Sequence, residues 1–254
     1  MRYFVEEGSV VREIWGKSDT ILFIFAGASA EFALNKAVDW LYFTGKLPAD
    51  PLGRLFSTVA YARQIVFSEL EGAHRAIDKM ASIHAAVEAK RGMAIPDWAY
   101  RDVLFMLIDY SIRSYELLER KLTETEKAEV FQVFNRVGSR MGIHGLPAAY
   151  KDWMVMREEH LGQNLQKGPY TLNLYQQYRK HLGPVRYALL LQGQVLVVPA
   201  IVNNMLRLGS FSLLSPVLAI YKVCRKLRLE WLLKAAILPP SYKTEIKALD
   251  TSPS

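Results

Sequence analysis

The amino-acid sequence predicts an all-α protein, folded as a single helical domain of about eight to ten helices. Apolar residues recur at steps of three and four along most of the chain, whereas segments that alternate apolar and polar residues are almost absent. Hydrophobic residues make up 51% of the 254 residues and charged residues 22%, which provides enough apolar material for a large core. No linker rich in Ser, Pro or Gly interrupts the chain, so we expect one domain over residues 1–254 with a loose tail at 245–254.

Capping residues and helix breakers predict where the helices begin and end. A first long helix is expected from Ser18 or Asp19, as the N-cap, to about Phe43. The segment "TGKLPADP" contains one glycine and two prolines and predicts a loop. Further helices are expected over about 51–67, 69–91 and 97–120, from the Thr123/Glu126 capping box to about 142, and in three or more segments divided at Gly168-Pro169, Gly183-Pro184 and Gly209.

The most hydrophobic stretch, residues 187–220, predicts a core helix rather than a membrane span. It contains Gln192, Gln194 and Asn203, and such polar side chains without partners would cost several kcal/mol in a bilayer. We therefore expect a buried helix that is kinked at Pro199.

Cysteine and charge usage exclude several classes of protein. The single cysteine, Cys224, excludes an intramolecular disulfide framework and a thiolate metal cluster, and we expect it to act as a small buried hydrophobe. No secretory signal is visible at the N-terminus, so the expected localisation is cytoplasmic.

The formal net charge of +7 raises the question of an anionic partner. Most basic residues are interleaved with acidic ones, which argues against nucleic acid. The local basic excess at 221–234 predicts either a solvated helix face or a peripheral contact with an anionic membrane surface.

His84 is the most informative single residue, because it occupies an apolar helical stripe. Ile77, Met80, His84 and Val87 recur at steps of three and four and therefore share one face. A core histidine bonded to a carbonyl is one interpretation of this position. A buried neutral imidazole is also what a haem iron requires as an axial ligand, and both interpretations stay open.

The preceding helix carries a candidate anion site. Arg54, Thr58, Tyr61 and Ile65 lie on one face, so the arginine and the threonine are placed to bind a carboxylate such as a haem propionate. The alternative is a structural network with nearby carboxylates, for which the candidates are Asp50, Glu69 and Asp109.

The sequence gives less support for a functional role of the other polar and aromatic groups. Glu71 and Asp78 lie three before and four after His74, a spacing that can bind a metal but that we expect to be an exposed polar face. The aromatic residues of the first helix and of 103–110 are expected to be core rather than the wall of a pocket. The first long helix also contains three candidates for an acid–base group, which are Glu31, Lys36 and Asp39. The alternative for each of them is an exposed position at the surface.

Five motifs carry a family resemblance over about residues 10–165. They are "DPLGRLFSTVAYARQIVF", "AHRAIDKMASIHAAV", "IPDWAYRDVLFMLIDYSIRSYELL", "LTETEKAEVF" and "MGIHGLPAAYKDW". Their order and spacing resemble the rubber oxygenases (latex-clearing proteins) and the related ER-bound oxygenase MpaB. The chain departs from this pattern at Ser57, where rubber oxygenases can have lysine, and at Val38-Asp39, where many relatives have His-Pro.

The resemblance implies a distantly globin-like helical bundle that binds haem b. It implies His84 as the proximal ligand of the iron, with Arg54 and Thr58 beside the haem. The expected activity is that of an oxidoreductase, an oxygenase that activates dioxygen to oxidise an apolar small-molecule substrate of isoprenoid or lipid type. Two alternatives stay open on the same fold: a non-enzymatic haem or lipid carrier, and a haem-free structural or membrane-surface protein.

Overall fold

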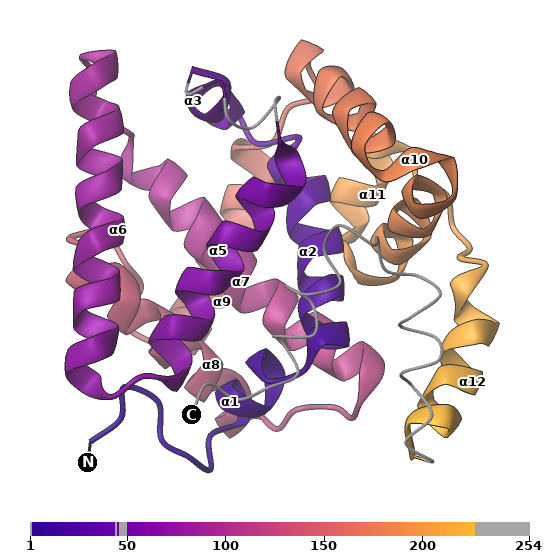
Figure 1. Ribbon diagram of the computed structural model, residues 1–254, viewed down its shortest axis with the longest axis horizontal. Coiled ribbons are helices and arrows are strands. Elements are labelled where there is room, and N and C mark those ends of the chain that lie inside the picture. Colours follow the sequence, from indigo (N-terminus) through magenta and orange to yellow (C-terminus); the bar gives the residue numbers. More distant parts are fainter. Residues whose placement is uncertain (1, 44, 46–49, 227–254) are drawn as a thin grey trace.

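The computed structural model describes residues 2–43, 45 and 50–226, and these residues form eleven α-helices (Figure 1). The prediction of an all-α fold is confirmed, and the described part of the chain contains no β-strand. The described residues form one helix more than the expected eight to ten, because the range of the predicted first long helix contains two helices and a further helix precedes it. The domain bounds of 1–254 stay a prediction.

The N-terminal region departs most from the sequence-based prediction. Its helices are α1 (Val10–Trp15), α2 (Ser18–Phe32) and α3 (Val38–Phe43), so the expected single helix from Ser18 to Phe43 is wrong. Asn35 breaks the helix, because its Oδ1 accepts a hydrogen bond from the Ala37 N–H at 2.8 Å and thereby forms a local turn. The backbone around this turn also pairs with residues 164–166, which replaces the hydrogen bonds that a continuous helix would have made.

Helices α5 (Pro51–Phe67) and α6 (Leu70–Arg91) form an antiparallel hairpin at one edge of the molecule (Figure 1). The carboxylate of Asp50 caps α5 by accepting from the Gly53 N–H at 2.8 Å, and Pro51 occupies the first turn. Gly92 ends α6 with a φ of 72°, a conformation that favours glycine. Both predicted helices are confirmed to within a residue.

The next three helices follow the predicted caps and breakers. They are α7 (Asp97–Leu118), α8 (Glu124–Arg140) and α9 (Tyr150–Gln163). At the start of α8, the Thr123 hydroxyl accepts from the Glu126 N–H while the Glu126 carboxylate accepts from the Thr123 N–H, which confirms the predicted capping box.

The C-terminal part of the described chain contains α10 (Pro169–Val197), α11 (Ala200–Leu206) and α12 (Leu214–Lys226). Gly183, with a φ of 73°, bends α10 where the sequence predicts a division. Pro199 does not kink a continuous helix but separates α10 from α11, because its ring fixes the start of the new helix. Only seven of the residues described in 187–220 are buried and the others are divided between half-buried and exposed, which corrects the expectation of a core helix.

None of the described helices is both long enough and apolar enough to cross a membrane. The buried polar side chains of α10 have partners within the protein. Gln194 accepts from the Tyr175 hydroxyl at 3.0 Å and donates to Ser29 Oγ at 3.1 Å. These bonds offset the cost of burying the amide.

The core is organised around the crossing of α2 and α7, which lie in the middle of the molecule between the α5–α6 hairpin and the α10–α12 helices (Figure 1). Gly27 allows this close approach. A Cβ atom placed there would lie 2.2 Å from Cδ1 of the fully buried Tyr110 ring. The aromatic and aliphatic residues of α2 and of 103–110 are mostly core, as predicted, although Val103 is exposed.

The Gly27→Ala substitution is expected to destabilise the protein by about 1–3 kcal/mol, because the added methyl group overlaps the Tyr110 ring. Chemical unfolding followed by circular dichroism measures this change. Gly162→Ala in α9 is the matched control, since nothing lies within 4 Å of its Cβ position and alanine favours the helix by roughly 0.5–1 kcal/mol. Equal stability changes for the two variants would contradict the role assigned to Gly27.

Candidate functional site

His84 lies on α6 in the predicted stripe, but it is half-buried rather than buried. Ile77 is fully buried, whereas Met80, His84 and Val87 are partly exposed. The buried residues of α6 all belong to its first eight positions, because its C-terminal half extends along the edge of the molecule beyond the core (Figure 1). The Nδ1 atom of His84 is nevertheless shielded from solvent, so the imidazole lies with one nitrogen inside the protein.

Tyr100 of α7 forms a wall beside the His84 ring. The two ring centroids are 5.3 Å apart and the planes meet at 74°, an edge-to-face arrangement. The Tyr100 hydroxyl donates to Glu88 Oε1 at 3.1 Å, and the Ile95 N–H donates to the same oxygen at 2.7 Å. Burial and the Glu88 carboxylate raise the pKa of Tyr100, so its hydroxyl stays a neutral donor and its ring is held in place.

The sequence-based analysis missed Tyr100 and Glu88. Glu88 follows His84 by four residues and therefore lies one turn further along the same face of α6. The four-residue spacing from His84 could therefore have identified Glu88 from the sequence. The contact of Tyr100 depends on how α7 packs beside α6, which no local pattern reveals.

Thr58 is half-buried on α5, the helix that packs against α6. The fold therefore brings the helix of Arg54 and Thr58 next to the helix of His84, as the predicted site requires (Figure 1). Arg54 belongs to α5, but its side chain lies outside the described residues. The assignment of these three residues as a binding site stays a prediction.

Two of the three carboxylates considered as structural partners of Arg54 have other partners in the fold. Asp109 pairs with Arg113 through Oδ1 at 2.7 Å and with Arg157 through Oδ2 at 3.0 Å. Asp50 acts as the cap of α5. These two carboxylates thus have defined roles in the fold.

Glu31, expected at the surface, is instead one of the most buried charged groups. Its two carboxylate oxygens accept from Arg157 of α9 at 2.5 and 2.6 Å, and Oε2 also accepts from the Tyr110 hydroxyl at 2.7 Å. Burial opposes the charge of Arg157, yet Glu31 and Asp109 raise its pKa above the ordinary value. Glu31 therefore holds α2, α7 and α9 together.

The other two acid–base candidates also have structural partners. Lys36 is exposed and donates to the Gln163 carbonyl at 2.5 Å. Asp39 accepts from Arg91 at 2.7 Å, and the Arg91 guanidinium lies 3.9 Å from the centroid of the Trp40 ring. This contact joins α3 to the C-terminal end of α6, the helix that carries His84.

A second buried polar cluster surrounds Asp102 of α7. Its Oδ2 accepts from Asn35 at 2.8 Å, its Oδ1 accepts from Asn164 at 3.2 Å, and Nδ1 of His160 lies against the same Oδ1. The cluster ties the turn after α2 to the end of α9. It explains the burial of His160.

The remaining histidine candidate does not form a metal site. The ring of His74 packs edge-on against Phe4, and Asp78 forms a bidentate ion pair with Arg140. Within the described part of the chain, no group of three or more His, Cys, Asp or Glu side chains is arranged to hold a metal ion.

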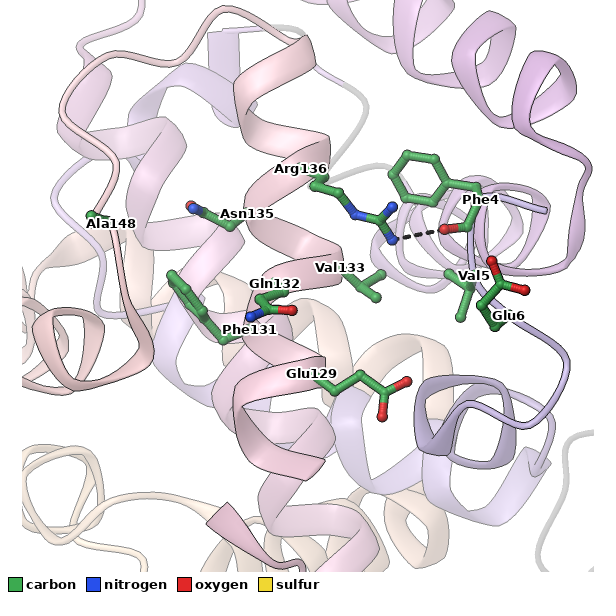
Figure 2. A pocket seen from close by; sticks show the side chains of 10 residues that line it. All are labelled: Phe4, Val5, Glu6, Glu129, Phe131, Gln132, Val133, Asn135, Arg136 and Ala148. Atoms are coloured by element: carbon green, nitrogen blue, oxygen red, sulfur yellow. Dashed lines mark hydrogen bonds between the residues drawn. The ribbon is translucent and has the colours of Figure 1, made fainter. Parts of the chain in front are cut away.

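A hollow of about 490 Å³ opens between the N-terminal segment and α8 (Figure 2). Arg136 closes one side, where its guanidinium lies 4.5 Å from the centroid of the Phe4 ring and donates to the Phe4 carbonyl at 2.7 Å. Glu6 and Glu129 also line it. None of the predicted site residues contributes to this hollow, so it is separate from the candidate site on α6.

The candidate site therefore consists of a half-buried histidine on a two-helix hairpin at the edge of an all-α domain. A family model described as the catalytic domain of ER-bound oxygenase mpaB/B'/rubber oxygenase matches residues 15–238. These features define a helical oxygenase catalytic domain. The chain belongs to the mpaB and rubber oxygenase family. Comparisons with curated proteins and with solved structures gave no match.

Arg157→Leu is expected to destabilise the protein by about 3–5 kcal/mol, because it leaves the carboxylates of Glu31 and Asp109 buried without their partner. Adding Glu31→Gln to this variant should recover part of the loss. Arg113→Leu is the control, since this side chain is 40% exposed and its pair with Asp109 contributes about 1 kcal/mol or less. Urea unfolding compares the variants, and an Arg157→Leu protein as stable as the Arg113→Leu protein would contradict this assignment.

Proposed function

We propose that this chain is a haem b-dependent oxygenase in which His84 ligates the iron and an apolar substrate of isoprenoid or lipid type is oxidised. The observation that carries the proposal is the match of residues 15–238 to an oxygenase catalytic domain. The position of His84 supports the finer assignment, because a half-buried imidazole on the helix that packs against α5 is accessible to a bound group.

The residues around His84 fit a haem. Among the neighbours one helical turn before and after it, Met80, Ala81 and Val87 are apolar, and the charged one, Glu88, accepts from the Tyr100 hydroxyl and the Ile95 N–H. A haem requires only one or two axial protein ligands, in contrast to a metal cage built from several side chains. The single histidine on this face meets that requirement.

Each residue of the site has a distinct task in this proposal. Haem iron, when bound, supplies the activation of dioxygen. Tyr100 restricts the rotation of the His84 ring through its edge contact, and Glu88 holds Tyr100. The Thr58 hydroxyl and the Arg54 guanidinium are the candidates to bind the haem carboxylates, because a cation and a hydroxyl together satisfy such a group.

A haem in this position would meet a site with no lysine available next to Thr58, since the preceding residue is Ser57. The acidic residues of α2 and α3 do not supply an acid–base group either, because Glu31 and Asp39 are held in ion pairs. We therefore assign no protein acid–base residue to the reaction. The haem itself carries the proposed activation of dioxygen.

The first test is the visible spectrum of protein purified from haem-supplemented cells. Wild-type protein is expected to show a Soret band, and His84→Ala to lose or shift it, because the axial ligand is removed. His74→Ala is the matched control, since His74 lies ten residues earlier on the same helix and is also half-buried.

Two results would overturn parts of this proposal. A colourless wild type that takes up no added hemin would exclude the haem oxygenase and favour a haem-free structural protein on this fold. A haem protein with no oxidation of apolar substrates under dioxygen would favour the alternative, a haem or lipid carrier.

Tyr100→Ala is expected to weaken haem binding by roughly twofold to tenfold, the loss that corresponds to an edge-to-face ring contact of about 0.5–1.5 kcal/mol. Tyr100→Phe keeps the ring and removes only the bond to Glu88, so a smaller loss is expected. Titration of the apoprotein with hemin measures both. A larger loss for phenylalanine than for alanine would rule out the ring contact as the important interaction.

A further inference from the structure

The positive charge of the protein is concentrated in one continuous part of the chain. Residues 160–229 contain nine Lys or Arg residues and no Asp or Glu, whereas the other 23 basic residues are offset by all 25 acidic ones. The net charge of +7 therefore originates entirely from this acid-free segment. It includes α10, α11 and α12, which lie together on the side of the molecule opposite α6 (Figure 1).

The same segment also exposes most of the large apolar side chains on the described surface. Fourteen large hydrophobic side chains are exposed among the described residues, and eight of them lie between 170 and 220. The four most exposed of these eight are Val185 (72%), Leu213 (70%), Phe211 (65%) and Ile220 (62%). The exposed apolar side chains thus gather in the segment that also carries the net charge, and apolar groups gathered on one flank are typical of an interaction surface.

Part of this apolar surface is an ordered face of α12. Val217 and Ile220, three residues apart, lie on one side of the helix, and Leu213 is the exposed residue directly before its first turn. The helix is held to the body by other groups. The Tyr221 hydroxyl donates to Asp19 Oδ2 at 2.8 Å, and the N–H of Leu213 donates to Gln192 Oε1 at 2.6 Å.

We propose that the flank formed by α10, α11 and α12 docks peripherally on a membrane that contains anionic lipids. Exposed apolar side chains enter the interface between headgroups and acyl chains, while Lys and Arg residues attract the anionic headgroups. The absence of carboxylates from 160–229 removes the repulsion that acidic residues would add. This inference does not depend on haem or on the proposed reaction.

The charge of the flank favours a membrane over the two other classes of partner. A second copy of this chain would bring two acid-free, basic surfaces together, and like charges oppose such a contact. Nucleic acid would be bound through phosphate contacts, which do not require exposed aliphatic side chains such as Val185 and Leu213. An anionic lipid surface satisfies both the charge and the apolar side chains.

The test is co-sedimentation of the full chain with phosphatidylcholine vesicles and with vesicles that also contain phosphatidylglycerol. We expect binding to the anionic vesicles, weakened by high salt because the headgroup attraction is screened. The double variant Leu213→Ser/Ile220→Ser should bind these vesicles roughly tenfold more weakly, since two inserted side chains are lost.

The matched control is Met154→Ser/Val155→Ser on α9, which removes two exposed apolar side chains outside the acid-free segment. It should bind like the wild type, and circular dichroism checks that all variants are folded. The proposal is overturned if the wild type does not bind anionic vesicles, or if the Leu213→Ser/Ile220→Ser variant binds them as well as the control does. It is also overturned by analytical ultracentrifugation that detects a dimer which this variant disrupts, since the surface would then join two copies of the chain.

Discussion

The packing of α2 against α7 and α9 depends on one buried arginine. Arg157 has a side chain that is only 4% exposed, and it is paired with the carboxylates of Glu31 and Asp109. A buried ion pair contributes little net stability compared with an apolar contact of the same shape, but its loss is costly because the partners stay buried. The contact therefore acts mainly as a constraint on how the three helices are arranged. Tyr110 adds to it, since its ring covers Gly27 and its hydroxyl bonds to Glu31.

This arrangement determines where the candidate site lies. With α2 and α7 at the centre, the α5–α6 hairpin occupies the edge of the domain, and the second half of α6 extends past the core (Figure 1). His84 is half-buried for that reason. The ion pair between Asp39 and Arg91 supports this part of α6 from α3.

The side of the molecule opposite α6 differs in its surface charge and in its exposed apolar side chains. The helices α10 to α12 combine basic side chains with exposed apolar ones, whereas the α6 side carries both acidic and basic residues. α10 contacts α2, α5 and α7, so the flank is joined to the same helices that support the candidate site. The candidate site and this flank therefore lie on opposite sides of one helical domain.

The sequence by itself determined those features that depend on nearby residues. The bounds of α5 and α6 were predicted to within a residue, because Asp50, Pro51 and Gly92 act on the backbone next to them. The capping box of α8 was predicted for the same reason, and the order of motifs sufficed to predict the family. Only the tertiary structure decided the break after α2, where Asn35 pairs with Asp102 across 67 positions of the chain. It also decided the burial of Glu31, whose partner Arg157 is 126 residues away, and the partial exposure of His84. These features depend on which helices come to lie side by side, and a helical period reveals which face of a helix is apolar but not what covers it.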